Sequence, residues 1–248
     1  MGRKRGVMKR LVAIAAVFGA VWSMNAAESP PPLPTAFAAV LPEKCSQVLF
    51  TVAEAQDATL AKLWLLEKNG REGWKAAGEP IRVRIGRKGM AWGRGEHSAR
   101  LPEGWRRKAE GDSCTPAGVF SLGTAFGRGA RPNWLRMPYL RCTQDLIAVD
   151  DPKSRHYNQF IDLRNAPPKD WNSAEQMLLS NGCYDVGLVI HHNADGRPGA
   201  GSCIFMHIWQ GPDIGTSGCT AMSKVDLIRV LKWLDPAKAP RLVQTVAK

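Results

Sequence analysis

Short runs of apolar residues recur along most of the chain, and clusters of Gly, Pro, Asn and Asp separate them. Several runs alternate apolar with polar positions, the period that places one face of a strand against a core. The Asn69-Gly70 pair between two runs is typical of a tight hairpin turn. We therefore expect a mostly β domain. The predicted strands cover residues 47–52, 61–66, 73–76, 81–85, 118–122, 146–149, 186–192 and 202–209.

Helical spacing of apolar residues occurs in only two places, residues 173–179 and 224–234. In the second, Val225, Ile228 and Leu231 recur at the helical period. Ser223 is a suitable N-cap residue, and Pro236 is a suitable terminator. The pattern predicts one or two helices, one of them close to the C-terminus.

The N-terminus has the pattern of a secretory signal peptide. A basic segment with Lys9 and Arg10 precedes an uncharged, largely apolar stretch over residues 11–27. A single membrane anchor is the alternative, but the strongly apolar part is shorter than the roughly 20 residues of a bilayer span. Cleavage is expected near Ala27 or as late as Ala38, within Ala36-Phe37-Ala38. We therefore divide the chain into a signal peptide (1–27), a Pro/Ala-rich linker (28–44), N-terminal strands (45–80) and a main domain (81–244). We expect the mature protein in the periplasm or cell wall, with no stable membrane anchor.

Composition and charge narrow the class of partner. With 44% hydrophobic and 23% charged residues the chain is neither disordered nor collagen-like. The formal charge is +12, and it stays at +7 without the five basic residues of the first 27. Outside the cytoplasm such a charge favours cell-wall polymers or anionic lipid heads, not nucleic acid, although a solvated basic surface with no partner explains it equally well.

The segment 201–222 carries the strongest chemical signal. A predicted strand delivers His207, a loop with Gly and Pro follows, and Gly218 stands immediately before Cys219. A thiol becomes a nucleophile when a base takes its proton, and His207 can serve as that base. Glycine before the cysteine allows backbone N–H groups to point at a developing oxyanion. A buried structural cysteine and histidine remain the alternative on these residues alone.

Other residues carry weaker signals. His191 and His192 are neighbours at a strand end and therefore face opposite sides, which disfavours a metal pair. His192 is a candidate for the cleft wall, with a structural role as the alternative. Trp209 is either a cleft wall or core packing. His97 and His156 are expected in polar loops.

Three ordered blocks between about residues 81 and 234 resemble the YkuD-type L,D-transpeptidases. Thr216, Gly218 and Cys219 match the family's Ser/Thr-His-Gly-Cys motif, and His207 matches its upstream histidine. The other two blocks are Asp112-Ser-Cys-Thr-Pro-Ala-Gly-Val-Phe120, similar to a Thr-Pro-x-Gly-x-Phe element, and Val149-Asp-Asp-Pro-Lys-Ser with Tyr157-Asn158.

The resemblance implies a β-sandwich or barrel-like catalytic fold and acyl transfer on peptidoglycan stem peptides through a Cys219 thioester, with no metal or cofactor. Two departures stand out: Ser217 replaces the motif's histidine, and Ala221 replaces an arginine that holds substrate in many members. Thr216, Ser217 and Gly218 are the expected substrate or oxyanion contacts, together with Trp209 and His192. The alternatives are a hydrolase of the same fold and a non-catalytic wall-binding module.

Six cysteines in an exported chain favour disulfides, but the nucleophile has to stay free. We expect Cys203 to be packed and reduced, on the same strand face as Phe205 and His207. Cys142 and Cys183 are the pair chosen for a disulfide.

Overall fold

The computed structural model describes residues 1–2, 28–68, 70 and 73–247. The predicted signal peptide and Asn69 of the predicted turn therefore lie outside the described residues, Met1 and Gly2 excepted. No helix in the described part of the chain is long and apolar enough to cross a membrane.

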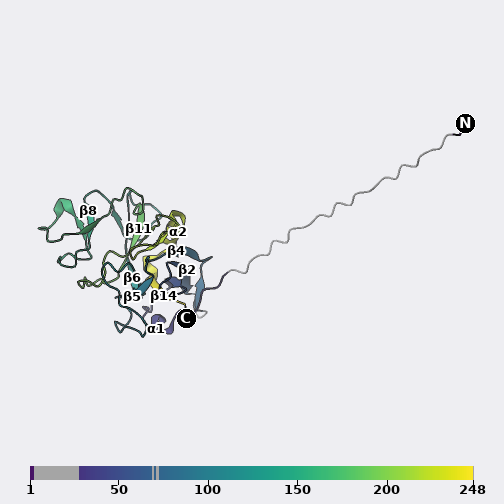
Figure 1. The fold of residues 1–248 in the computed structure, drawn as a ribbon, viewed down its shortest axis with the longest axis horizontal. Coiled ribbons are helices and arrows are strands. Elements are labelled where there is room, and N and C mark those ends of the chain that lie inside the picture. Colours follow the sequence, from purple (N-terminus) through teal and green to yellow (C-terminus); the bar gives the residue numbers. More distant parts are fainter. Residues whose placement is uncertain (3–27, 69, 71–72, 248) are drawn as a thin grey trace.

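A closed β-barrel forms the centre of the molecule (Figure 1). Its strands follow the order β1-β14-β6-β11-β12-β13-β4-β2, and β2 pairs again with β1 to complete the ring. Full closure leaves none of these strands as an unpaired edge. The barrel strands are β1 (Gln47–Ala53), β2 (Leu60–Lys68), β4 (Ile81–Arg84), β6 (Thr115–Gly127), β11 (Val186–Ile190), β12 (Phe205–Ile208), β13 (Thr220–Met222) and β14 (Arg241–Val246).

The barrel encloses a hydrophobic core to which most of these strands contribute. Phe50, Leu63, Phe120 and Met206 are among its fully buried side chains. Three short strands extend the sheet outside the ring: β3 (Trp74–Ala76) on β2, and β5 (Met90–Trp92) and β7 (Tyr139–Arg141) on β6. The mainly β, barrel-like fold is thus confirmed, and its first strands belong to the same sheet as its last.

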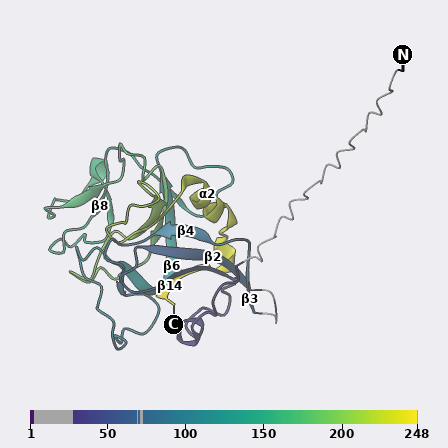
Figure 2. The same ribbon diagram turned by 45° about the vertical axis from the view of Figure 1, so that its right-hand side comes forward.

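A separate three-stranded sheet lies beside the barrel, at the β8 label of Figures 1 and 2. It consists of β10 (Ala174–Gln176), β8 (Leu146–Val149) and β9 (Phe160–Asp162), in that order, followed by a 3-10 turn at Leu163–Asn165. The prediction of a helix over 173–179 is therefore wrong. Ala174 and Gln176 pair with Val149 and Ile147 of β8, and this long-range pairing outweighs the local helical spacing.

The C-terminal helix is confirmed as α2 (Lys224–Trp233). Its N-cap Ser223 accepts a hydrogen bond from the N–H of Asp226 at 3.1 Å. Leu227, Val230 and Leu231 form its buried face, and a 3-10 turn at Pro236–Lys238 follows it. The helix packs against β11 and β12, the latter being the strand that carries His207.

The segment 28–44 is not a free linker. It contains a short helix, α1 (Thr35–Ala38), and the side chain of Phe37 is buried. The Phe37 ring stacks on Trp92 with 5.8 Å between centroids and meets the edge of His97. An aromatic anchor thus holds this segment on the barrel, which its Pro/Ala-rich composition did not predict.

All six cysteines lie in the described part of the chain, and all six are free and buried. The predicted Cys142–Cys183 disulfide is therefore absent from the structure. Both residues belong to one apolar cluster with Phe126 and Phe205. Burial raises the pKa of Cys183 and raises that of Cys142 to about 11, so both thiols are protonated at neutral pH.

Candidate active site

Cys219 lies at the end of a tight turn that leads into β13, and Gly218 makes this turn possible. Gly218 has φ +152°, and a Cβ added there would lie 3.1 Å from the carbonyl oxygen of Cys114. A side chain at position 218 would push the two segments apart. The glycine before the cysteine is thus explained by close backbone approach.

Two threonine hydroxyls hold the carbonyl group of Cys219. Thr216 Oγ1 donates to this oxygen at 2.6 Å and Thr115 Oγ1 donates at 3.1 Å. Thr115 in turn accepts a hydrogen bond from the N–H of Gly86 at 2.8 Å. Thr115 begins the Thr-Pro-Ala-Gly-Val-Phe block, so the structure joins two sequence motifs that lie about a hundred residues apart. Sequence reasoning had assigned Thr115 no role.

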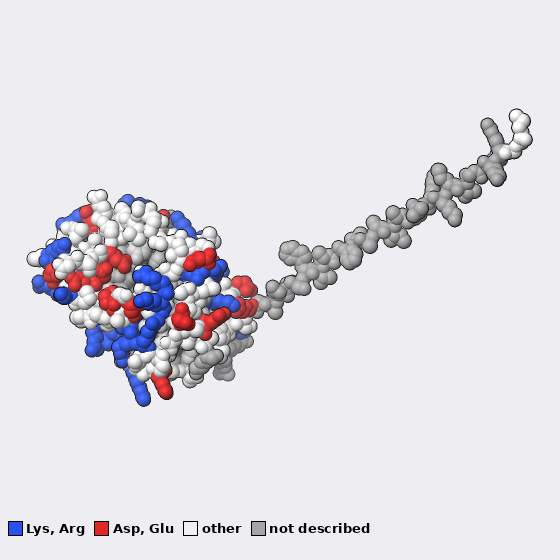
Figure 3. All heavy atoms as spheres, viewed as in Figure 1, with Lys and Arg blue, Asp and Glu red and all other residues white. Residues whose placement is uncertain are grey.

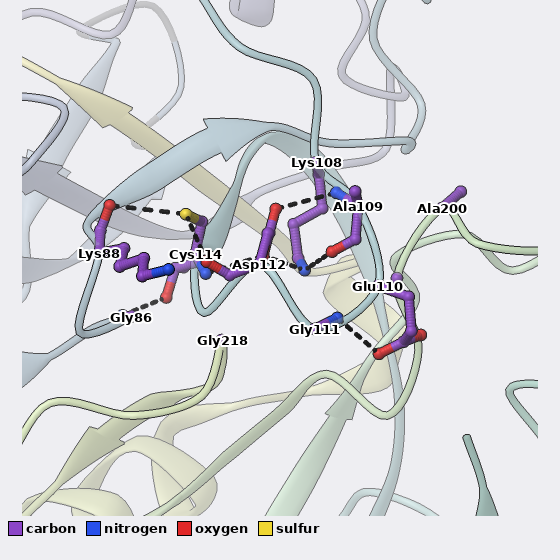
Figure 4. A network of polar contacts seen from close by, with 12 residues as sticks. Gly86, Lys88, Lys108, Ala109, Glu110, Gly111, Asp112, Cys114, Ala200 and Gly218 are labelled. Carbon is purple, nitrogen blue, oxygen red and sulfur yellow. Dashed lines mark hydrogen bonds and ion pairs between the residues drawn. The ribbon is translucent and has the colours of Figure 1, made fainter. Parts of the chain in front are cut away.

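A buried ion pair supports the Cys114 side of this turn (Figure 4). Lys108 Nζ contacts Asp112 Oδ1 at 2.7 Å and donates to the carbonyl of Ala109 at 2.8 Å, with its side chain only 3% exposed. Asp112 Oδ1 also accepts from the N–H of Cys114 at 2.9 Å. This network fixes the Cys114 carbonyl against Gly218 (Figure 4).

A third polar network holds the segment that precedes β12. Asn158 Oδ1 accepts from the N–H of Cys203 at 2.9 Å, while its Nδ2 donates to the carbonyls of His192 and Asn193. Cys203 has φ +53° and lies outside β12, which begins only at Phe205. The expectation that Cys203 extends the strand and shares a face with His207 is therefore wrong. Its carbonyl instead turns toward Cys219.

The thiol of Cys219 is buried and is held by main-chain groups. Its Sγ accepts from the N–H of Phe205 at 3.3 Å and donates to the carbonyl of Cys203 at 3.6 Å. Burial, followed by the negative charge of Glu175, raises the pKa of this thiol to about 12. The Cys219 thiol is thus neutral at physiological pH.

His207 lies on β12 beside β13, with Ala221 as its register partner. Because Cys219 precedes Ala221 by two residues, His207 and Cys219 point to the same side of the parallel pair. His207 Nδ1 donates to the carbonyl of Ile208 at 2.8 Å, which leaves Nε2 free to accept a proton. The edge-to-face ring of Tyr184, at 5.3 Å, holds the imidazole, and burial lowers its pKa.

One cavity of about 440 Å³ contains both Cys219 and His207. Its wall also includes three of the residues expected there: Trp209, Thr216 and Ser217. The cavity therefore brings together a thiol, a neutral imidazole and the turn that holds the cysteine carbonyl. No hydrogen bond links the thiol to the imidazole in this resting arrangement of the two described residues, whose partners are the main-chain groups named above.

A comparison with protein families agrees with this geometry. Residues 57–243 match the YkuD family, the L,D-transpeptidase catalytic domain. The chain belongs to the YkuD family. The match covers most of the chain and begins before β2, so the strands preceding Ile81 are largely part of the family's domain. Searches of curated proteins and of solved structures find no match.

The two departures from the usual YkuD motif meet at one place in the cavity. Ser217 and Ala221 both line it, and the Arg87 side chain reaches Ser217, with Nη1 donating to Oγ at 3.1 Å. The backbone N–H of Arg87 also donates to the carbonyl of Thr216 at 2.8 Å. An arginine from the segment after β4 thus contacts the residue that stands in place of the motif's histidine.

The backbone N–H groups of residues 217–219 differ in whether they have a hydrogen-bond partner. Gly218 N–H donates to Thr216 Oγ1 at 3.1 Å and is therefore committed to the turn itself. Among the described residues, no hydrogen bond uses the N–H of Ser217 or of Cys219. These two amides are therefore without a hydrogen-bond partner in the described part of the chain, whereas that of Gly218 has one.

His192 does not belong to the Cys219 cavity. It is buried, its Nδ1 accepts from the N–H of Arg94 at 3.2 Å, and its Nε2 bonds the carbonyl of Ala200 at 3.0 Å. The expectation of a cleft role is therefore wrong, and the structural alternative holds. His97 is also buried, against Gly118, not in a polar loop. No three His, Cys, Asp or Glu side chains in the described ranges are placed to hold a metal ion.

The cavity-wall residues that sequence reasoning missed include Glu175, Tyr184 and Arg87. Tyr184 OH donates to Glu175 Oε2 at 2.7 Å. Glu175 comes from β10, the strand that the sequence pattern presented as a helix, and Arg87 follows a strand of alternating basic residues. No local signal separates these two charged residues from ordinary surface positions.

Proposed function

We propose that this YkuD protein is a cysteine acyltransferase that modifies peptidoglycan stem peptides. The observation that carries the proposal is the shared cavity, in which the Cys219 thiol and the free Nε2 of His207 face the same space. The family supports peptidoglycan chemistry in general. The basic surface, where patches of Lys and Arg alternate with acidic patches (Figure 3), is compatible with an anionic polymer.

The reaction proceeds in two balanced steps. His207 Nε2 takes the thiol proton as Cys219 Sγ forms a bond to a peptide carbonyl carbon, and the N–H groups of Ser217 and Cys219 bind the oxyanion. The C–N bond then breaks, and His207 returns its proton to the departing amine, which leaves a thioester. An amine or water attacks the thioester and gives its proton to His207. The sulfur leaves as thiolate and regains that proton.

The protonation states of Cys219 and His207 before substrate binds are consistent with this mechanism. With the Cys219 pKa raised to about 12 and the His207 pKa lowered, the resting pair is thiol and neutral imidazole, not thiolate and imidazolium. The proton moves only as substrate binds and the thiol turns from the Cys203 carbonyl. Such a nucleophile resists adventitious alkylation and oxidation because it is buried and protonated.

The test is a product assay with purified muropeptides and the mature protein, read by mass spectrometry. We expect release of the C-terminal D-amino acid from tetrapeptide stems, together with cross-linked dimers if an amine accepts the acyl group, or tripeptides if water does. Cys219→Ser protein is the matched control and should give neither product. Folded wild-type protein that binds muropeptides without converting them would instead favour the wall-binding alternative.

A further inference from the structure

The loop between β12 and the Cys219 turn, residues 209–215, forms one wall of the Cys219 cavity. Main-chain hydrogen bonds fix its two ends. The N–H of Trp209 donates to the carbonyl of Met222 at 2.9 Å, and the N–H of Thr216, the residue after the loop, donates to the carbonyl of Ile85 at 2.9 Å. The middle of the loop lies at the surface and needs support of its own. Four residues of the loop line the cavity: Trp209, Gln210, Ile214 and Gly215.

Two arginines of β4 hold the middle of this loop. Among the described residues, every hydrogen bond that joins residues 210–215 to another segment ends on Arg82 or Arg84. Arg84 Nε donates to the carbonyl of Pro212 at 2.5 Å, and its Nη2 donates to Asp213 Oδ1 at 2.6 Å. Its Nη1 donates to Thr59 Oγ1 at 3.3 Å. All three guanidinium nitrogens of Arg84 thus have a partner, and two of these partners belong to the loop.

Arg84 holds the loop more firmly than Arg82 because it is buried. The side chain of Arg84 is 9% exposed, whereas that of Arg82 is 52% exposed. A charge-assisted hydrogen bond is stronger where water is excluded, and the planar guanidinium presents its donors in fixed directions. Pro212 and Asp213 are themselves exposed, so water can solvate them when the loop moves away. One buried cation therefore decides how long this part of the loop stays on the barrel.

The strand register brings Arg84 to the sheet face that carries His207. Ala221 of β13 is the register partner of His207 in β12 and of Arg84 in β4. Register partners share a face of a sheet, so the imidazole and the guanidinium leave the barrel on the same side, two strands apart. Ala221 between them has only a methyl group, which keeps the path of the loop from β12 to the Cys219 turn free of a larger side chain.

We propose that Arg84 is a positioning residue for acyl transfer: by holding the loop at Pro212 and Asp213, it keeps this wall of the cavity in place for the substrate. The inference rests on the proposed function, because the wall matters only if a peptide binds in the cavity. Arg84 itself does not line the cavity. The Cys219 turn is attached separately, through Thr216. Loss of Arg84 should therefore weaken substrate binding and spare the chemical step.

Steady-state kinetics with a stem tetrapeptide test this division between binding and chemistry. Arg84→Gln should raise KM roughly tenfold, the scale of one lost charge-assisted hydrogen bond, and leave kcat within about twofold. Asp213→Asn should act in the same direction, and the double variant should be no worse than Arg84→Gln alone, because both changes remove one contact. The matched control is Arg136→Gln, which should keep the wild-type KM, since Arg136 bonds the Asp235 carboxylate at 3.0 Å and two carbonyls outside the cavity. A loss confined to kcat, or additive losses in the double variant, would overturn the proposal.

Hydrogen exchange of the free protein separates this inference from the proposed function, because it needs no turnover. In Arg84→Gln the amides of residues 210–215 should exchange roughly tenfold faster than in the wild type, while those of β12 and α2 keep their rates. That result, with a matching loss of tetrapeptide affinity, would support the role of Arg84 even if the wild type converts no peptide, an outcome that sinks only the acyltransferase proposal. Unchanged exchange of residues 210–215, or faster exchange throughout the barrel, would overturn the inference. Should Arg84→Gln not fold, Asp213→Asn alters a side chain that is 80% exposed and gives the same comparison.

Discussion

At the scale of single residues, the proposed chemistry depends on the uncharged forms of Cys219 and His207. Burial raises the pKa of the Cys219 thiol and lowers that of the His207 imidazole, so both groups favour their uncharged forms. His207 Nδ1–H is fixed on the Ile208 carbonyl, which leaves Nε2 free to accept a proton. In the proposed mechanism His207 has to be unprotonated, so we expect activity to fall when that ring gains a proton.

The pH dependence of kcat/KM tests the protonation state proposed for His207. Because burial lowers the His207 pKa below its usual 6.5, the acid limb of kcat/KM should reach half its maximum below pH 6.5. NMR titration of the imidazole should place its midpoint at the same pH as the kinetic limb. His156→Asn, which alters a histidine outside the cavity, should leave the limb in place. A half-maximal rate above pH 6.5 would show that His207 is not the buried base described here.

At the scale of elements, polar side chains from separate segments hold the main chain at Cys203 and Cys219. Thr115 at the start of β6, Asn158 before β9 and Thr216 before β13 all bond main-chain groups of Cys203 or Cys219. The polar side chains of the sequence blocks thus hold backbone atoms around Cys219. Their positions could be predicted as motifs. The partners of Thr115 and Asn158 could not, because these two bonds each join separate motifs.

Thr115→Val tests this link between β6 and the nucleophile turn. The change leaves the N–H of Gly86 and the carbonyl of Cys219 each without the hydroxyl partner, at a cost of about 1–3 kcal/mol in the free energy of unfolding. We expect that loss in denaturant unfolding, together with slower acylation of Cys219. Thr245→Val is the matched control, since its hydroxyl bonds only the adjacent carbonyl of Val246, at 3.4 Å. Wild-type stability and rate in Thr115→Val would refute the coupling.

At the scale of the whole molecule, the pattern of apolar runs predicted eight of the fourteen strands in the described residues. It missed β13 and β14 of the barrel, and it did not predict the strand order. The runs at 47–52 and 146–149 correspond to β1 and β8 almost residue for residue. That β1 pairs with β14 in parallel, and closes the barrel on β2, depends on contacts between the two ends of the chain. The same limit explains the error at 173–179 and the missed Glu175, because pairing with β8 decides both.

The candidate site also contains residues that the sequence could predict and residues that it could not. Cys219, His207 and the turn 216–218 could be identified from a local motif, since strand and loop signals surround them in one segment. The cavity wall could not, because Arg87 and Glu175 reach it from segments with no motif of their own. His192 shows the converse error: a polar residue beside a strand end faces inward and satisfies two backbone groups.

The central claim is that Cys219 carries the acyl group, and intact-protein mass spectrometry during turnover of a stem tetrapeptide tests it most directly. The wild-type protein should gain the mass of the tripeptide acyl group, and peptide mapping should place it on Cys219 as a thioester cleaved by hydroxylamine. Cys219→Ser should gain no such mass, and His207→Ala should gain it about 10²-fold more slowly. Turnover without a Cys219 adduct, or undiminished turnover by Cys219→Ser, would contradict the account.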